Sequence, residues 1–520
     1  MAPRIRIAIL LSFAILPLAI YLGRDRLSTS CRCFPDDTCW PLPEQWDNLN
    51  ASLSGNLIAT IPIGSVCHTN TSFAPYSRQK CSELQSHWSI PATHYQDPSS
   101  PMAACWANFS CSPFTAGCTL KVLHFTTRHN IRLSIRNTGH DYLGKSTAPG
   151  SVALWTHNLK SIEYKPNYTT SWYAGPALRV GAGIQGLEAQ DVAHRSGKGH
   201  VIVSGHSPDI GFAGGYTQGG GHGPLASRYG LAADQVLEWE VVTAKGGILT
   251  AFPGQNADLY WALAGGGGGT FAVVVRMTVR MYPEEQTASA SLAFQFDAAD
   301  SQAWEVVRTF LLGTPPLTDA GGTALWVLYP GPTAATFIGG PIVLPGAGAE
   351  ELQSYLAPTL ELLREYEMGY TTTAVNVTEF HVGGALVPRS TIQSNPNGFI
   401  STLQEILRHE AAISSYSMNV SRPTNSPVSA NAVNPAWRNA AVSLLLGIPF
   451  NYTDHQVNVE NQKLMTDVLL PQVSALVGPG KQGALLKIKQ KYDPKQIFYG
   501  RTAVGSERWV EHGNGRLCYA

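Results

Sequence analysis

The feature that most restricts the fold of this chain is a glycine-rich segment, residues 205–223, in which eight of the nineteen residues are glycine. Glycine offers no side chain for packing and loses the most backbone freedom on folding, so this density indicates that a ligand or another segment approaches the backbone closely. The segment is not a P-loop, because Gly-Lys-Ser/Thr is missing. No strand leads straight into a Gly-x-Gly-x-x-Gly turn and a helix, which excludes a Rossmann fingerprint. The segment therefore predicts a ligand site built from backbone, with a loop that uses its glycines only for packing as the alternative.

A second segment, residues 135–146, runs from an apolar strand into a loop of Gly, Asn, Ser and Thr with His140 at its centre. Successive backbone N–H groups in a tight turn form an anion-binding concavity, and Arg136 or Lys145 would add positive charge for a pyrophosphate. In its neutral form the imidazole of His140 is a candidate nucleophile. A loop histidine that only makes hydrogen bonds is the alternative.

A third segment has a helical stretch at 259–264, five consecutive glycines at 265–269 and a strand at 270–274. Taken alone, this glycine run is also compatible with a flexible hinge. Its interpretation therefore depends on the other two segments.

The composition excludes partners that need a strong electrostatic field. The 520 residues include 36 Lys plus Arg and 36 Asp plus Glu, so no net charge favours nucleic acid or an anionic membrane surface. The hydrophobic fraction of 44% and the charged fraction of 14% are those of a globular protein. We expect a neutral small molecule as the partner and no nucleic acid.

The N-terminus predicts entry into the secretory pathway. Arg4 and Arg6 precede an almost unbroken apolar run at 7–22, which is the pattern of a signal peptide, taken here as residues 1–23. No clear small-x-small cleavage site precedes Arg24, so an uncleaved anchor in the ER membrane is the alternative. We expect a secreted protein that contacts no membrane unless the signal is retained.

Nine cysteines agree with an oxidising compartment. Eight of them lie before residue 119 and the ninth is Cys518, and no Cys-x2-Cys pair occurs, so no metal site is predicted. The pairing cannot be deduced from the sequence, and one thiol is left over. Seven acceptor sequons predict N-glycans on exposed surface, at Asn50, Asn70, Asn108, Asn167, Asn376, Asn419 and Asn451.

The periodicity of apolar residues predicts an α+β fold with two lobes. Residues 24–118, rich in Cys, Pro and Ser, are expected to form an N-terminal extension tied by disulfides. Residues 119–284 should form the first lobe, 285–480 a second lobe whose antiparallel sheet is covered by helices, and 481–520 a segment that returns to the first lobe. Strands are expected at 131–135, 178–184, 201–203, 236–243, 324–329, 336–343, 371–380 and 441–448, and further helices at 120–130, 185–196, 301–312, 350–367, 399–412 and 457–477.

Taken together, the three glycine-containing segments resemble the FAD-binding domain of the vanillyl-alcohol oxidase and p-cresol methylhydroxylase (PCMH) superfamily. The resemblance is strongest to its berberine-bridge-enzyme-like branch and to the fungal isoamyl-alcohol-oxidase-like members. It continues through Gly-Leu-Ala-Ala-Asp at 230–234, Glu-Val-Val-Thr-Ala at 240–244 and Tyr-Asp-Pro at 492–494, so it covers most of the chain from about residue 131. It implies a PCMH-type FAD-binding lobe, and a second lobe that binds the substrate.

The resemblance also assigns roles to particular residues. His140 matches the histidine that bonds the flavin 8α carbon, and Ser207 stands where bicovalent relatives carry a cysteine, so FAD attached through His140 alone is implied. Tyr216 falls where relatives place a residue beside the flavin ring and is the candidate catalytic residue, with packing as the alternative. The residues expected around the FAD are Arg136, Asn137, Thr138, Gly139, His140, Asp141, Tyr142, Gly144, Lys145, Ser146, Ser207, Gly211, Gly214, Gly215, Gly219, Gly220, Gly221, Asp234, Gly268, Gly269, Phe271 and Val274.

The chain departs from the family pattern just before the second segment. Relatives carry an additional strand and the start of a helix between the cysteine matching Cys118 and the helix before Ile131, whereas only residues 119–130 are available here. A divergent loop, an alternative splice form or an erroneous gene model would each explain the shortening, and the last two would compromise FAD binding. A flavin-free secreted glycoprotein that binds ligands is therefore the rival interpretation from a different class.

The resemblance implies oxidation of a small organic molecule. A hydride would pass from a substrate carbon to the flavin while a base removes a proton, and dioxygen would reoxidise the cofactor and leave as hydrogen peroxide. Oxidation of an alcohol to a carbonyl in fungal secondary metabolism is the first choice, followed by oxidative cyclisation or desaturation, and then by carbohydrate oxidation. The candidates for the base are Tyr370, His381 and the segment 434–438, each with a purely structural role as the alternative.

Overall fold

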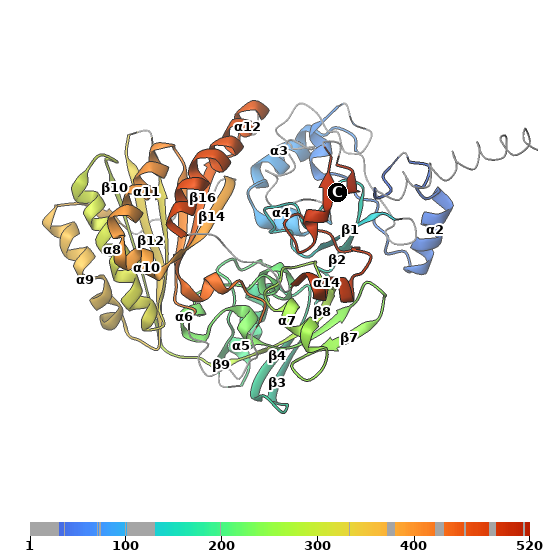
Figure 1. The fold of residues 1–520 in the computed structure, drawn as a ribbon, viewed down its shortest axis with the longest axis horizontal. Helices are drawn as coiled ribbons and strands as arrows, with labels where there is room; N and C mark the ends of the chain where they lie inside the picture. The colour runs from blue at the N-terminus through green and yellow to red at the C-terminus, as the bar shows by residue number, and fades with distance from the viewer. Residues whose placement is uncertain are drawn as a thin grey trace, which may run out of the picture.

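The computed structural model describes residues 31–98, 100, 130–371, 380–421, 431–477 and 485–520, apart from positions 36, 70, 72–73, 198, 332, 452–453 and 513–514. Two lobes lie side by side, and the N-terminal extension packs on one of them together with the C-terminus (Figure 1). The expected signal segment at 1–23, the expected helix at 120–130 and the shortened stretch before residue 130 lie outside the described residues.

The first lobe is built on a five-stranded antiparallel sheet in the order β3-β4-β8-β6-β7. Trp239 of β6 and Met277 of β8 are completely buried, and they share one core with Phe271. The strands are β3 (Ile162–Thr169), β4 (Ala174–Gly181), β6 (Val236–Val242), β7 (Ile248–Ala251) and β8 (Val273–Arg280), and the helices α5 (Gly186–Arg195), α6 (Ala226–Tyr229) and α7 (Ala257–Leu263). The short strands β5 (His200–Val201) and β9 (Tyr282–Pro283) pair beside them.

A separate parallel pair of strands, β1 (Arg132–Arg136) and β2 (Ser151–Trp155), lies next to this sheet. β1 is the strand that the sequence predicts before the His140 loop. Its outer edge is flanked by the N-terminal extension at Cys33, which bridges to Ile131, and by the C-terminal segment at Phe498, which bridges to Leu133. Two ends of the chain therefore support the strand from which the His140 loop starts.

The second lobe is a seven-stranded antiparallel sheet in the order β13-β10-β12-β11-β15-β16-β14. The strands are β10 (Thr287–Phe296), β11 (Thr323–Tyr329), β12 (Ala335–Pro345), β13 (Tyr370–Thr371), β14 (Phe380–Pro388), β15 (Ala412–Ser417) and β16 (Ala440–Pro449). The helices are α8 (Ser301–Asp319), α9 (Ala349–Glu365), α10 (Arg389–Ser394), α11 (Pro396–Arg408), α12 (His455–Lys463), the π-helical η6 (Leu464–Leu469) and α13 (Leu470–Val477). The predicted α+β fold with an antiparallel sheet is confirmed, and Figure 1 shows α8 to α11 on the side of the sheet away from the first lobe.

Two predicted helices of the second lobe have different limits. The helix expected at 399–412 ends at Arg408, because Glu410 adopts a left-handed conformation with φ of 57° and β15 begins at Ala412. The helix expected at 301–312 continues to Asp319 although it contains Pro315 and Pro316. Most of the strand expected at 371–380 lies outside the described residues.

The inner face of the second sheet packs against the first lobe. Tyr416 on β15, together with Val433, forms one hydrophobic cluster with Leu231 and Ala264 of the first lobe. Beside this cluster Arg438, in the 3-10 helix η5 (Pro435–Asn439), donates two hydrogen bonds of 2.7 and 2.8 Å to the carboxylate of Asp234. Apolar burial and one bidentate ion pair thus fix the two lobes against each other.

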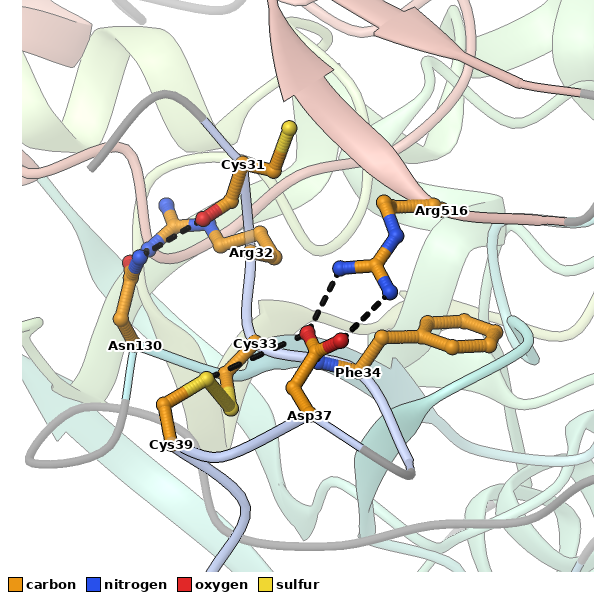
Figure 2. The surroundings of a disulfide bond; sticks show 8 residues. All are labelled: Cys31, Arg32, Cys33, Phe34, Asp37, Cys39, Asn130 and Arg516. Atoms are coloured by element: carbon orange, nitrogen blue, oxygen red, sulfur yellow. Dashed lines mark hydrogen bonds and ion pairs between the residues drawn. A yellow bond between two sulfur atoms is a disulfide. The ribbon is translucent and has the colours of Figure 1, made fainter. Parts of the chain in front are cut away.

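One disulfide and one ion pair tie the N-terminal extension to the C-terminal end of the chain, and two further disulfides lie within the extension. The extension contains α2 (Pro43–Ser52), η1 (Ile63–Cys67), α3 (Arg78–His87) and α4 (Pro91–Tyr95). Its disulfides pair Cys31 with Cys518, Cys33 with Cys39 and Cys67 with Cys81. Figure 2 shows the guanidinium of Arg516 against the carboxylate of Asp37, with N–O distances of 2.6 and 2.7 Å. The remaining cysteines, Cys105, Cys111 and Cys118, lie outside the described residues.

Removing the disulfide between Cys31 and Cys518 by a double substitution with serine should lower the stability of the protein by about 2–4 kcal/mol. The bond joins residues 487 positions apart, so its loss restores much conformational freedom to the unfolded chain. Thermal unfolding followed by circular dichroism measures the effect. The Cys33→Ser/Cys39→Ser variant is the control, since that bond closes a loop of only 6 positions and its loss should matter less. Equal losses in the two variants would contradict the prediction.

No helix in the described ranges is both long and apolar enough to cross a bilayer. The three disulfides agree with folding in an oxidising compartment.

Candidate active site

A cavity of about 850 Å³ lies where the two lobes meet. The first lobe contributes the loop after β1, the π-helical turn η3 (Phe212–Tyr216) and the glycines before β8. The second lobe contributes β14 and the helix through η6, and residues 499–502 of the C-terminal segment complete the wall. Ligand sites generally measure about 300–1,000 Å³, so this cavity suits a large ligand.

The cavity brings together most of the residues predicted for the cofactor site, from all three segments. Those that line it are Asn137, Thr138, Gly139, His140, Asp141, Tyr142, Lys145, Ser146, Gly211, Gly214, Gly215, Tyr216, Gly219, Gly268, Gly269 and Val274. The juxtaposition arises because β1 and the two glycine-rich stretches end at the same side of the first lobe. Their assignment to a bound cofactor remains a prediction.

Arg136 does not line the cavity, contrary to the expectation that it adds charge there. Its guanidinium is completely buried and donates hydrogen bonds to the backbone oxygens of His94, at 2.8 Å, and Ser100, at 2.5 Å. Burial lowers the pKa of Arg136 to about 10. The positive charges at the cavity wall come instead from Lys145 and Arg501. Arg136 therefore ties the N-terminal extension to β1.

Six other predicted residues also lie outside the cavity wall. Asp234 is the partner of Arg438, and Phe271 belongs to the core of the first lobe. A Cβ atom on Gly221 would lie 2.8 Å from the Cβ of Ala232, so close packing explains that glycine. The other three are Gly144, Ser207 and Gly220.

Two of the glycines that line the cavity lack a side chain for different reasons. Gly268 lies against Gly215, since a Cβ atom on Gly268 would be 2.7 Å from the Gly215 Cα. A Cβ atom on Gly215, by contrast, would meet no atom within 4 Å. The missing side chain of Gly268 explains why the two glycine-rich stretches can touch. The empty surroundings of Gly215 show open space on the cavity side.

Two polar side chains on the cavity wall have oxygens with no hydrogen-bond partner in the described part of the chain. The Nδ2 of Asn137 donates to the Ala182 oxygen at 2.5 Å, which leaves its Oδ1 unpaired. The Nε2 of Gln218 donates to the Ala213 oxygen at 3.0 Å, and its Oε1 is likewise unpaired. Buried unpaired acceptors are costly, so both indicate a ligand that carries hydrogen-bond donors. An FAD, with its ring imide and ribityl hydroxyls, meets this requirement.

His140 lies between the cavity and a carboxylate. The imidazole lines the cavity, and its Nε2 is 3.2 Å from the Oδ1 of Asp209, with both side chains about 16% exposed. Burial acts to raise the pKa of Asp209, but the contact with His140 and a backbone hydrogen bond together outweigh it, so that the pKa lies below its usual value. The carboxylate is therefore charged at neutral pH.

Tyr216, the predicted catalytic residue, keeps its proton. Its hydroxyl donates to the backbone oxygen of His222 at 3.2 Å, and burial raises its pKa well above the usual value. A protonated phenol at the cavity wall can donate a hydrogen bond but is not a ready base.

Sequence reasoning missed the second-lobe wall and the C-terminal contribution. From the second lobe the cavity is lined by His381, Val382, Gly383, Gly384, Gln462, Met465, Thr466 and Leu470, and from the C-terminus by Tyr499, Gly500, Arg501 and Thr502. Of the candidate bases only His381 reaches it, whereas Tyr370 and the 434–438 segment do not. The pair Gly383-Gly384 inside a strand was a usable signal, because interior glycines in strands often mark a close approach, and here a Cβ atom on Gly384 would lie 2.2 Å from the Leu444 backbone oxygen.

The two-lobed fold and the glycine-lined cavity define a flavin-dependent oxidoreductase, and comparisons with known proteins agree. The FAD binding domain family matches residues 113–251. The FAD-linked oxidoreductase sor8 of Hypocrea jecorina (strain QM6a) is 38% identical, over 98% of this chain and 97% of its own length. The FAD-linked oxidoreductase patO of Penicillium expansum is 37% identical over 95% of both chains.

Solved structures place the fold in the same superfamily. The VAO-type flavoprotein MtVAO615 from Myceliophthora thermophila C1 superposes with a TM-score of 0.83 at 35% identity, over 94% of this chain and 100% of the other. The BBE-like 1 protein of Physcomitrella patens shares the fold, with a TM-score of 0.58 at 18% identity over 72% of this chain and 87% of its own. The chain belongs to the FAD-linked oxidoreductases of the vanillyl-alcohol oxidase type, which confirms the predicted superfamily and enzyme class, and it shares its fold with the berberine-bridge-enzyme-like proteins.

The comparison with sor8 also bears on the length of the chain. That alignment extends over 570 positions, whereas this chain has 520 residues, so part of the relative has no counterpart here. The shortening that the sequence indicates before residue 130 stays a prediction.

Proposed function

We propose that this protein oxidises a neutral small organic molecule, converting an alcohol to a carbonyl, with FAD held covalently by His140 and dioxygen as the electron acceptor. The observation that carries the proposal is the position of His140 on the wall of a glycine-lined cavity that the second lobe closes. When bound, FAD supplies the two-electron redox chemistry, and the protein supplies binding, orientation and electrostatics.

The second-lobe wall supports a neutral substrate. Among the described residues that line the cavity from this lobe, none is an Asp, Glu, Lys or Arg. The histidine in this wall, His381, is buried, and its Nε2 lies 3.1 Å from the Oδ1 of Asn458. A charged substrate would lose its hydration on this side of the cavity without gaining a residue of opposite charge, and this would cost free energy.

The polar groups available to the substrate define two roles. Tyr216, protonated at neutral pH, would donate its hydrogen bond to a substrate oxygen once the hydroxyl turns away from the His222 oxygen, and so would orient the substrate. His381 is the remaining candidate for accepting the substrate proton, through rotation away from Asn458.

Replacing His140 with alanine should abolish covalent flavin. Intact-mass spectrometry of the full-length, deglycosylated wild-type protein should find one added FAD, and denatured protein on a gel should fluoresce. The His140→Ala chain should do neither, because the bond to the flavin is proposed to form at the His140 imidazole. Ser207→Ala is the control, and it should retain the label, since Ser207 lies outside the wall. A wild-type protein without flavin would favour the flavin-free binding glycoprotein.

Peroxide release tests the reaction. Neutral alcohols should give hydrogen peroxide and a carbonyl product, whereas charged analogues and sugars should be poorer substrates. Oxidative cyclisation or desaturation is the second candidate, favoured because the Bifunctional decalin synthase calF of Penicillium decumbens is 33% identical over 98% of this chain and 99% of its own. A ring-closed or desaturated product without a carbonyl would select it.

A further inference from the structure

Asp209 is the charged group that faces the imidazole of His140. Its Oδ1 lies 3.2 Å from the His140 Nε2, and in the described part of the chain that nitrogen has no hydrogen-bond acceptor in linear geometry. A small rotation of the ring would align the N–H with the carboxylate. Asp209 itself does not line the cavity, so the imidazole is placed between the carboxylate and the ligand space.

The segment that carries Asp209 is held firmly. The Nε2 of Gln185 donates to the Asp209 backbone oxygen at 2.9 Å, and the Gly186 N–H donates to the Ile210 oxygen at 2.9 Å. The Gly211 N–H donates to the Oγ1 of Thr138 at 3.2 Å, which joins this segment to the His140 loop. Both partners of the contact are thus fixed to the same framework, and such support is what a working catalytic pair requires.

We propose that Asp209 is the base that activates His140 for attachment to the flavin, as a positioning residue that acts through the imidazole. The inference rests on the covalent attachment proposed above. A carboxylate at one ring nitrogen fixes the imidazole tautomer and strengthens the other nitrogen as a nucleophile, which is the logic of the Asp–His pair in hydrolases. The carboxylate is ionised in the folded protein, as this role demands.

The reaction balances with dioxygen as the oxidant. One C–H bond of the flavin 8-methyl group and the N–H bond of the imidazole break, and one N–C bond forms. The proton of the imidazole passes to Asp209, and the two electrons released by the methyl carbon enter the flavin ring system. Dioxygen then takes these electrons together with two protons, the one lost from the methyl group and the one passed to Asp209, and leaves as hydrogen peroxide.

The contact also selects the nitrogen that forms the bond. Because Nε2 faces Asp209, its proton is the one that leaves, and the free electron pair is on Nδ1. The bond is therefore formed at Nδ1. In the flavin-labelled peptide the new methylene group then lies next to a single ring proton, whereas attachment at Nε2 would place it next to two.

Asp209→Asn tests the proposal, since it keeps the shape and removes the base. Full-length protein produced under riboflavin limitation is incubated with FAD in air, and gel fluorescence measures the covalent fraction against time. General bases contribute about 10²–10⁴ in rate, so attachment should be at least about a hundredfold slower than in the wild type. Native protein should still be yellow, with flavin that is released on denaturation.

Two further variants separate a base from a structural residue. Asp191→Asn is the matched control on α5, a 44% exposed aspartate paired with Arg195, and it should attach flavin at the wild-type rate. Asp209→Ala should be rescued by added formate, with a rate that rises with formate concentration, because only a missing base is replaced in this way. Nuclear Overhauser contacts in the labelled peptide identify the bonded nitrogen.

The outcomes distinguish this proposal from the proposed function. A wild-type protein without covalent flavin would overturn both. Three results would overturn the role of Asp209 and leave the proposed function standing, provided that the wild type carries covalent flavin. They are attachment at the normal rate in Asp209→Asn, no effect of formate on Asp209→Ala, and a bond at Nε2 of the histidine.

Discussion

Asp493→Ala should lower the free energy of unfolding by about 3–5 kcal/mol, the loss expected when one partner of a buried ion pair is removed. Asp493 and Lys489 are 0% and 2% exposed, and the Lys489 Nζ lies 2.5 Å from the Asp493 Oδ2. Burial lowers the pKa of Lys489, which the charge of Asp493 opposes. Without Asp493 the ammonium group would stay buried and lose its counter-charge.

The same ion pair connects three segments of the chain that lie near the cavity. Lys489, on α14 (Leu485–Tyr492), also donates to the backbone oxygens of Thr270, at 2.7 Å, and Phe498, at 2.5 Å. Asp493 accepts from the N–H groups of Ile497 and Phe498 at 2.8 and 2.9 Å. Thr270 follows the glycines of the cavity wall, so the substitution should weaken flavin retention as well as stability.

Denaturant unfolding of the full-length protein measures the first effect, and visible absorbance per polypeptide measures the second. Lys491→Ala is the control on the same helix. Lys491 pairs with Asp258 at the surface, and its side chain is 60% exposed, so its loss should change stability far less. A change in Asp493→Ala no larger than that of the control would contradict the prediction.

Gly215→Leu should weaken flavin retention about tenfold to a hundredfold while the stability of the flavin-free protein stays close to that of the wild type. A Cβ atom on Gly215 meets no protein atom within 4 Å, so the new side chain extends into the cavity rather than into the core. Forcing extra methylenes into a filled site costs about 1–3 kcal/mol, which corresponds to this range of affinity. Here the bound ligand, and not the protein, would meet the leucine.

Flavin content before and after extended dialysis, and thermal unfolding of the apoprotein, separate the two effects. Gly369→Leu is the matched control, because its Cβ atom also meets nothing within 4 Å and the residue lies away from the cavity. Both variants are compared in a His140→Ala background, where no covalent bond retains the flavin. If Gly215→Leu then retained flavin as well as this control does, the cavity would not be the flavin site.

The proposed covalent attachment determines the background in which Gly215→Leu is measured. A flavin bonded to His140 cannot be lost by dialysis, so Gly215→Leu is best examined together with His140→Ala. In that background the measured flavin content reports on the cavity alone. The family relationship does not depend on either result, since the fold and the relatives define it.

The sequence by itself determined the features that depend on neighbouring residues. The alternation of apolar residues predicted β1, β6, β11 and β16, and the glycine density predicted which backbone stretches would border the cavity. Spacing of this kind acts over a few residues, because strand and helix periods are local properties of the chain. The family resemblance added His140, which the structure places at the cavity wall.

Only the tertiary structure decided which distant residues meet. Arg136 turns to the carbonyls of the N-terminal extension, Arg501 reaches the cavity from the C-terminal segment, and Cys31 pairs with Cys518. The carboxylate of Asp209 likewise meets His140 across 69 positions of sequence. No local pattern records such contacts, because they follow from how the lobes pack and from the cost of leaving a buried charge without a partner.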